Sequence, residues 1–310
     1  MKEAIWAILG ELKRLRAEGE EALPIGEEAV ESLAKFARAA DGQEVVETPE
    51  EIKFAKDVEI NLKEEAKKLK EGAAGKIKIV VRGGDFEIDQ IPAPKPFVLP
   101  GGSKREKWEA LREIVLGDEV CNAHLHPEKK VVFGVGNLDA DIFFCGEAPG
   151  ADEEIQGEPF VGKAGQLLTK IIKAMGLERE NVYIGNIMNW RPELPTKTGN
   201  RPPTAEEMAY CLPYLKAQID IVKPKVIVAL GMTAVNGLLG VDPKRKMGSS
   251  RGVWHSFCGI DLMITYHPSF LLQYASAEKK RLVWEDMMAV MERVGLPISA
   301  RQRGYFLPRE

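Results

Sequence analysis

The sequence predicts an α/β protein: a three-layer α/β/α sandwich with a central parallel sheet, preceded by a mostly helical N-terminal extension. Short apolar runs typical of buried strands alternate with amphipathic helical patterns over residues 104–294. Strands that alternate with helices in this way form a parallel sheet covered on both faces. A segment dense in Pro and Gly, 92–103, precedes this region. We therefore expect an extension over 1–100, one domain over 104–294 and a C-terminal tail over 295–310.

The extension is predicted to be helical over 1–75, with a break at Pro24 and Gly26 and a short strand at 76–84. It is also acidic. Residues 1–60 hold 8 Lys or Arg against 15 Asp or Glu, and the remaining 250 residues hold 35 against 32. The net charge of −4 therefore belongs to the front of the chain. The rest keeps enough basic residues for a face that binds nucleic acid.

The elements of the main domain follow from apolar patterning. Four segments have the composition of strands buried on both faces, namely 140–146, 181–188, 225–231 and 261–268. Helices are predicted over 163–175, from the capping box of Thr204 and Glu207 onward, and over 278–294. Cys258 falls in a predicted β-hairpin. This order of elements is the basis for the sandwich.

Composition narrows the cellular context. No apolar run reaches the roughly 18 residues that a transmembrane helix needs, and the N-terminus lacks the cleavage pattern of a signal peptide. The cysteines are widely spaced and show no pairing pattern, which is typical of a reducing compartment. We expect a cytoplasmic protein with no membrane partner.

Polar motifs follow three of the predicted strands. GEAPGADEE follows the first strand, Asn186 lies near the end of the second, and a His-Pro-Ser motif that begins at His267 follows the fourth. In an open α/β sheet the carboxyl ends of the strands border the ligand crevice. Glu147, Glu153, Asn186 and His267 are therefore expected around one pocket. The GEAPG turn alone is also typical of a phosphate nest or a tight turn, and it lacks the P-loop spacing of nucleoside triphosphatases.

Four motifs together resemble the family 4 uracil-DNA glycosylases: GEAPGADEEIQGEPFVGKAGQLL, YIGNIMNWRP, GNRPPTAEEM and TYHPSFLL. The resemblance runs from about Lys104 to Met291, roughly 60% of the chain. It implies the fold of the uracil-DNA glycosylase superfamily and an activity in base excision repair. A uracil would be flipped out of single- or double-stranded DNA and its N-glycosidic bond hydrolysed without strand cleavage. We expect a nucleoid-associated monomer.

The resemblance also implies roles for single residues in base binding. Asn186 corresponds to the amide that reads N3–H and O4 of uracil, and Phe160 to the aromatic that stacks on the base. Taken alone, Phe160 would by default be a core residue. Gly146 and Ala148 belong to the same base-binding turn. Ala148 stands where some superfamily members place a water-activating Asp.

Three residues are implied to take part in catalysis. His267 corresponds to the histidine that donates a hydrogen bond to uracil O2 as negative charge develops there. Glu147 and Glu153 occupy the family's two acidic positions. A carboxylate at either position stabilises the sugar cation or orients water. Which glutamate has which role stays open at this stage.

Contacts to DNA are expected around the segment that follows His267. Leu271 or Leu272 is a candidate wedge that enters the base stack, although two leucines that begin a core helix are an equal alternative. Ser269 is also a candidate DNA contact. Lys163 and Arg251 are candidate phosphate contacts, each with solvated surface charge as its alternative.

The chain departs from the family at the metal site. Most family 4 enzymes hold a [4Fe-4S] cluster on four cysteines, and here the four positions carry Cys121, His124, Trp190 and Cys211. Two thiolates and one imidazole are too few for an ordinary cluster, so we predict that no cluster or other metal is bound. A zinc site built from Cys121, His124, His126 and Cys211 is the remaining metal alternative.

Two further functions fit part of this pattern. Ala148 leaves the size of the pocket open, so a broader glycosylase for hypoxanthine or xanthine is one alternative. The other is a protein that binds or covalently traps uracil-DNA with little turnover. One superfamily branch traps DNA with a histidine on an Arg-rich loop, and the corresponding segment 193–204 contains no histidine. This difference counts against trapping.

Overall fold

The computed structural model describes residues 76–81, 84–89, 91–192, 201–274 and 276–307. The chain divides into two units, Met1–Gly75 and Lys76–Glu310. The helices predicted for residues 1–75 therefore lie outside the described residues. Among the helices that the structure describes, none is long and apolar enough to cross a membrane.

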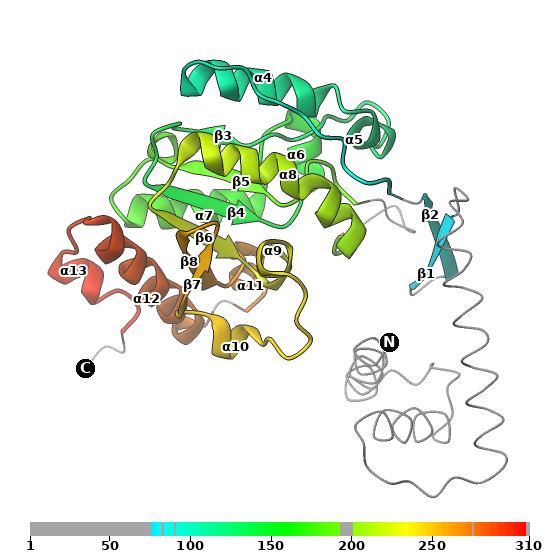
Figure 1. The fold of residues 1–310 in the computed structure, drawn as a ribbon. Coiled ribbons are helices and arrows are strands. Elements are labelled where there is room, and N and C mark those ends of the chain that lie inside the picture. Colours follow the sequence, from blue (N-terminus) through cyan, green and yellow to red (C-terminus); the bar gives the residue numbers. More distant parts are fainter. Residues whose placement is uncertain (1–75, 82–83, 90, 193–200, 275, 308–310) are drawn as a thin grey trace, which may run out of the picture. The chain divides into compact units, whose positions relative to one another are not determined.

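A six-stranded sheet forms the centre of the second unit (Figure 1). Its strands are β3 (Val135–Gly136), β4 (Ile142–Gly146), β5 (Tyr183–Asn186), β6 (Val226–Leu230), β7 (Trp254–Phe257) and β8 (Ile260–Thr265). The spatial order is β3-β5-β4-β6-β8-β7. The central strands β5, β4, β6 and β8 are parallel, as predicted, and both edge strands pair antiparallel, so that the sheet is mixed.

Helices cover both faces of the sheet, which confirms the predicted α/β/α layers (Figure 1). One face packs against α4 (Lys104–Leu116), α8 (Ala205–Val222) and α9 (Met232–Leu239). The other packs against α7 (Lys163–Ala174) and α12 (Ala277–Val294). Alternate residues of a strand point to opposite faces. In β4, Phe143 and Cys145 enter the first core and Ile142 and Phe144 the second, so the strand is apolar throughout.

The helices begin where local capping chemistry predicts. Thr204 accepts from the backbone N–H of Glu207 at the start of α8, and the Glu207 side chain accepts from Thr204 N–H in return. Ser103 and Glu106 form the same arrangement at α4. The shorter helices are α5 (Glu119–Ala123), α6 (Ala151–Gln156), η1 (Arg179–Asn181), α10 (Met247–Ser250), α11 (Pro268–Gln273) and α13 (Ala300–Arg303).

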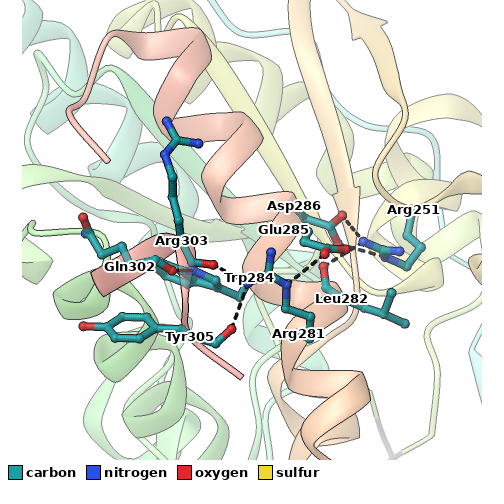
Figure 2. Close-up of polar contacts among 9 residues, drawn as sticks. All are labelled: Arg251, Arg281, Leu282, Trp284, Glu285, Asp286, Gln302, Arg303 and Tyr305. Atoms are coloured by element: carbon teal, nitrogen blue, oxygen red, sulfur yellow. Dashed lines mark hydrogen bonds and ion pairs between the residues drawn. The ribbon is translucent and has the colours of Figure 1, made fainter. Parts of the chain in front are cut away.

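Two segments outside the sandwich core have structure of their own. The strand predicted at 76–84 is one half of a hairpin, in which β1 (Lys76–Val81) pairs antiparallel with β2 (Gly84–Asp89). The segment after α12 also folds, as far as residue 307. Trp284 Nε1 donates to the Gln302 carbonyl at 2.6 Å, and Arg281 donates to the Tyr305 carbonyl at 2.9 Å (Figure 2). The C-terminal segment is therefore anchored on α12.

Candidate active site

The carboxyl ends of the central strands bring four of the predicted residues together. Gly146 and Asn186 are neighbours in the parallel register of β4 and β5. A Cβ atom on Gly146 would lie 2.4 Å from Asn186 Oδ1 and 2.5 Å from Phe160 Cζ. The rings of Phe160 and His267 have centroids 5.7 Å apart. We call Gly146, Phe160, Asn186 and His267 the pocket group.

Phe160 is held rigidly in this group. Its φ of 56° lies in the left-handed region, where a bulky residue is rare and strained. Gly165 of α7 packs on its backbone so closely that a Cβ there would lie 1.9 Å from the Phe160 carbonyl oxygen. Phe160 is 6% exposed, and its ring faces Gly146 and His267. The strained backbone thus turns an aromatic face toward the strand ends.

Asn186 presents an unused acceptor to this ring. The residue is 7% exposed, and its Oδ1 atom has no hydrogen-bond partner among the described residues. A buried acceptor left without a partner costs about 1–3 kcal/mol. A Cβ on Gly146 would meet both Oδ1 and the Phe160 ring, so the absence of a side chain there lets the two groups lie beside one another. A ligand that donates an N–H to Oδ1 beside the Phe160 ring would satisfy this acceptor.

His267 is a neutral hydrogen-bond donor. Its Nδ1 atom accepts from the Ser269 backbone N–H at 3.2 Å and lies 2.8 Å from Ser269 Oγ. Since Nδ1 is the acceptor, the neutral ring carries its proton on Nε2. Burial lowers the pKa of His267 to about 4, so the ring is uncharged at pH 7. Gly231, with a φ of 90°, brings the end of β6 within contact of the His267 Cβ.

Glu147 follows Gly146 directly and is partly buried. Burial raises the pKa of its carboxyl group, and a hydrogen bond with Thr233 opposes that rise. Its backbone carbonyl accepts from Met188 N–H at 3.0 Å, which fixes the turn beside β5. Glu147 is thus a carboxylate at the edge of the pocket group. Ala148, the next residue, packs against the core instead.

Glu153 has a different environment. Its Oε1 accepts from the backbone N–H groups of Val161 at 2.9 Å and Gly162 at 2.8 Å, and its Oε2 accepts from Gly150 N–H at 3.1 Å. The carboxylate therefore ties the start of α6 to the segment that carries Phe160 into α7. These contacts favour a positioning role for Glu153 over the activation of water.

Comparison with known proteins identifies the domain around this site. The sequence profile of the uracil DNA glycosylase superfamily matches residues 133–288, half of the chain. The chain belongs to the uracil-DNA glycosylase superfamily. It is 43% identical over 187 residues to the type-4 uracil-DNA glycosylase of Thermotoga maritima, which covers 60% of this chain and 93% of the relative. These matches confirm the family 4 resemblance of the four motifs.

Other similar proteins include further type-4 enzymes and a more distant type-5 enzyme. Identity to the type-4 enzyme of Pyrobaculum aerophilum is 38% over 171 residues, 53% of this chain and 84% of the relative. For the type-4 enzyme of Archaeoglobus fulgidus it is 48% over 128 residues, 41% of this chain and 62% of the relative. A type-5 enzyme of P. aerophilum is 28% identical over 173 residues, 51% of this chain and 72% of the relative.

The predicted DNA-contact residues of this glycosylase domain differ in their solvent exposure. Leu271 is 5% exposed and packs inward from α11, whereas Leu272 is 48% exposed. Of the two wedge candidates, the structure therefore presents Leu272 to solvent. Ser269 is occupied by its hydrogen bonds with His267. Lys163, the first residue of α7, is exposed and makes no ion pair within the part of the chain that the structure describes.

The Arg251 side chain is held by hydrogen bonds within the fold. Its Nε donates to Asp286 Oδ2 at 3.1 Å, its terminal nitrogen donates to the Leu282 carbonyl at 2.7 Å, and a second contact reaches Asp286 Oδ1 (Figure 2). Thr265 Oγ1 also donates to Asp286, at 2.6 Å. The two charged side chains are 13% and 1% exposed. This buried pair favours a structural role for Arg251 over a phosphate contact.

The four positions of the family's metal site also lie together. We call Cys121, His124, Trp190 and Cys211 the Trp190 group. Both cysteines are fully buried, and a hydrogen bond with Cys211, together with burial, raises the pKa of the Cys121 thiol. His124 stacks on Trp190 with ring centroids 5.4 Å apart. The indole, which is fully buried, meets Tyr210 edge-on at 6.1 Å.

The donor set of the Trp190 group does not fit an iron–sulfur cluster. Two cysteines and an imidazole stacked on an indole replace the four cysteines of the family. Within the described residues, no three His, Cys, Asp or Glu side chains are placed to hold a metal ion. His126, a member of the zinc alternative, instead contacts Glu154 through Nδ1 at 2.9 Å. Glu154 is also paired with Arg191.

One feature beside the pocket was not anticipated from the sequence. Tyr266, Phe270 and Tyr274 form a row of ring contacts that begins at the residue before His267. Their regular spacing of four residues was visible in the sequence. Gly231, the last residue of a predicted strand, also approaches His267, which was not expected from the sequence.

Proposed function

We propose that this chain hydrolyses the N-glycosidic bond of a uracil flipped out of DNA, without cleaving the strand. As a type-4 uracil-DNA glycosylase it is a hydrolase of N-glycosyl bonds whose substrate is uracil-containing DNA. The observation that carries the finer proposal is the unpaired Oδ1 of Asn186, buried near the ring of Phe160. C1′ of a stacked nucleotide is out of reach in a duplex, so the base must enter this pocket from outside the helix.

Base recognition rests on Asn186 and Phe160. The Oδ1 atom of Asn186 accepts from uracil N3–H, and its amide N–H donates to O4. Cytosine presents an acceptor at N3 and a donor at C4, so both contacts would be reversed. Stacking on Phe160 adds about 1–3 kcal/mol and does not depend on the identity of the base. Selection of uracil therefore resides in the amide.

Leaving-group stabilisation is assigned to His267. When the glycosidic bond breaks, negative charge develops on uracil O2 and positive charge on the sugar. The Nε2–H of neutral His267 donates to O2, and one preorganised donor of this kind contributes about 10²–10³ in rate. The low pKa of His267 keeps the ring as a donor without a formal charge across neutral pH.

Glu147 is the carboxylate that we assign to the sugar cation or to the attacking water. It is adjacent to Gly146 in the pocket group, whereas both oxygens of Glu153 are occupied by backbone N–H groups. Among the described residues, neither the pocket group nor the two glutamates beside it supply a lysine amine that could form a Schiff base with the sugar. This residue set supports the proposal of hydrolysis without strand cleavage.

We also propose that the enzyme acts as a monomer and without an iron–sulfur cluster. The support for the second point is the Trp190 group, in which an indole and a stacked imidazole occupy two of the four ligand positions. Protein purified without oxygen is expected to contain no stoichiometric iron and to lack the visible absorbance of a cluster. Close to four iron atoms per chain would overturn this proposal.

The activity is tested on oligonucleotides that carry uracil, hypoxanthine or thymine, as single strands and as duplexes. After incubation with the full chain, alkali reveals abasic sites, and omission of alkali reveals strand cleavage. We expect alkali-labile sites at uracil only, and none without alkali. Sites at hypoxanthine would indicate a broader glycosylase. Retention of uracil-DNA without release of base would indicate a binding or trapping protein and would contradict turnover.

A further inference from the structure

Three aromatic rings, which we call the aromatic stack, run along α11 from the residue before His267 to the surface. Tyr266 and Phe270 are nearly parallel, with ring centroids 4.4 Å apart and an interplanar angle of 10°. Phe270 and Tyr274 follow at 5.0 Å, with their planes tilted by 39°. The stack begins one residue before His267 and ends at Tyr274, which is 59% exposed. One of its ends is thus beside the chemistry and the other is in solvent.

The exposed end has the properties of a stacking surface. Tyr266 and Phe270 are partly buried, so the inner rings are fixed while Tyr274 keeps most of its surface accessible. An aromatic side chain that is already held by its neighbours loses little conformational entropy when a ligand stacks on it. Leu272, 48% exposed, projects from the same short helix. Exposed apolar groups gathered beside an active site indicate a ligand surface.

The chemistry of this surface matches an unstacked nucleobase. When a nucleotide leaves the DNA stack, the base next to it loses one stacking partner. Aromatic side chains bind such bases through their faces, with little dependence on sequence. Because the stack begins beside His267, a flipped nucleotide in the pocket places its neighbours in the strand near α11.

We propose that Tyr274 stacks on the base adjacent to the flipped uracil, supported from behind by Phe270 and Tyr266. This inference rests on the proposed function and extends it to a second nucleotide of the substrate. Tyr274 is a binding residue in this account, remote from the bond that breaks. Its loss should therefore raise KM and leave kcat nearly unchanged.

The test compares Tyr274→Ala and Tyr274→Phe with the wild-type chain on a uracil-containing single strand. We expect Tyr274→Ala to raise KM between about 5-fold and 150-fold, which corresponds to the roughly 1–3 kcal/mol of one stacked base. Tyr274→Phe retains the ring face and should stay within about 2-fold of wild type, well inside that range. Val98→Ala, at a position 91% exposed in the segment before α4, controls for the loss of exposed apolar surface.

Two further substrates identify the base that stacks on Tyr274. One carries an abasic site on the 5′ side of the uracil, and the other carries an abasic site on the 3′ side. If Tyr274 stacks on that neighbour, the effect of Tyr274→Ala should vanish on one of the two, because ring and base form a coupled pair. An unchanged KM for Tyr274→Ala, or an equal rise on all three substrates, would overturn the inference. If wild type released no uracil at all, the proposed function would fail instead.

Discussion

The pocket group and the Trp190 group each contain one buried polar atom without a partner among the described residues, and their surroundings differ. Asn186 Oδ1 lies beside Gly146 and the ring of Phe160, at the carboxyl ends of β4 and β5. Trp190 Nε1 lies among the packed rings of His124 and Tyr210. An unpaired buried polar atom therefore needs a second observation to indicate a ligand site, and for Asn186 that observation is the oriented His267 ring beside Phe160.

The two groups also hold their histidines differently. His267 is oriented by Ser269 so that Nε2–H is its donor, and its ring faces Phe160. His124 lies flat against Trp190. One arrangement prepares a hydrogen bond for a ligand, and the other contributes packing. We infer that the first region carries the activity and that the second stabilises the fold.

The largest expected difference is between these two histidines. His267→Ala should lower kcat for uracil release about 10²–10³-fold, the typical loss for one preorganised donor, with little change in KM. His124→Ala removes the same imidazole ring from the Trp190 group and should leave kcat within a few-fold of wild type. Single-turnover rates at saturating enzyme measure both. Similar losses in the two variants would remove the functional distinction between the regions.

Gly146 offers a steric test of the pocket group. In Gly146→Ala the new methyl group would overlap Asn186 Oδ1 and the Phe160 ring and displace both. We expect a loss in kcat/KM on the order of 10²-fold, because displacements of about 1 Å in an active site have costs of that size. Gly248→Ala is the matched control, since a Cβ there meets no atom within 4 Å. Full activity in Gly146→Ala would contradict the pocket geometry.

The pKa of His267 predicts a pH dependence of stability. The folded value is about 4 against 6.5 for an unperturbed histidine. Between these values the unfolded chain binds the additional proton, so the free energy of unfolding falls as pH decreases from about 6.5 to about 4. At 1.36 kcal/mol per pKa unit, about 3 kcal/mol is the upper bound. Urea unfolding across this range should show a smaller slope for His267→Gln; equal slopes would exclude His267 as the cause.

Two partly buried carboxylates give the smallest effects. Glu153 accepts three backbone N–H groups beside the pocket group, and Asp118 accepts from Cys121 N–H, Tyr210 and Tyr214 beside the Trp190 group. Glu153→Gln and Asp118→Asn should each lower the free energy of unfolding by about 1–3 kcal/mol. Only Glu153→Gln should also lower kcat, because it loosens the segment of Phe160. An intact kcat in that variant would refute the positioning role.

Most of the sandwich could be predicted because its signals are local. The four central strands are mostly apolar because helices cover both faces, and the capping box of Thr204 and Glu207 marks a helix start. The edge strand β3 escapes prediction because it has two residues, too few for any periodicity. The second strand of the hairpin, β2, was likewise not predicted.

The sequence patterns predicted which residues lie near one another better than they predicted their contacts. Motif order at the strand ends predicted that Asn186 and His267 lie near one another, and the family resemblance added Gly146 and Phe160. The difference between Glu147 and Glu153 depends on which backbone N–H groups point at each carboxylate, and this follows from the path of the chain between α6 and α7. The burial of Arg251 similarly depends on Asp286, 35 residues away.

A paired measurement on Asn186→Ala and Trp190→Ala tests the distinction between the two regions most directly. For each variant, uracil release from DNA and the free energy of unfolding are measured under the same conditions. Asn186→Ala should lose about 10²-fold or more in kcat/KM while its stability changes little. Trp190→Ala should lose about 3–5 kcal/mol of stability and keep the activity of the molecules that remain folded. Unchanged uracil release by Asn186→Ala, or inactive but folded Trp190→Ala, would contradict the account.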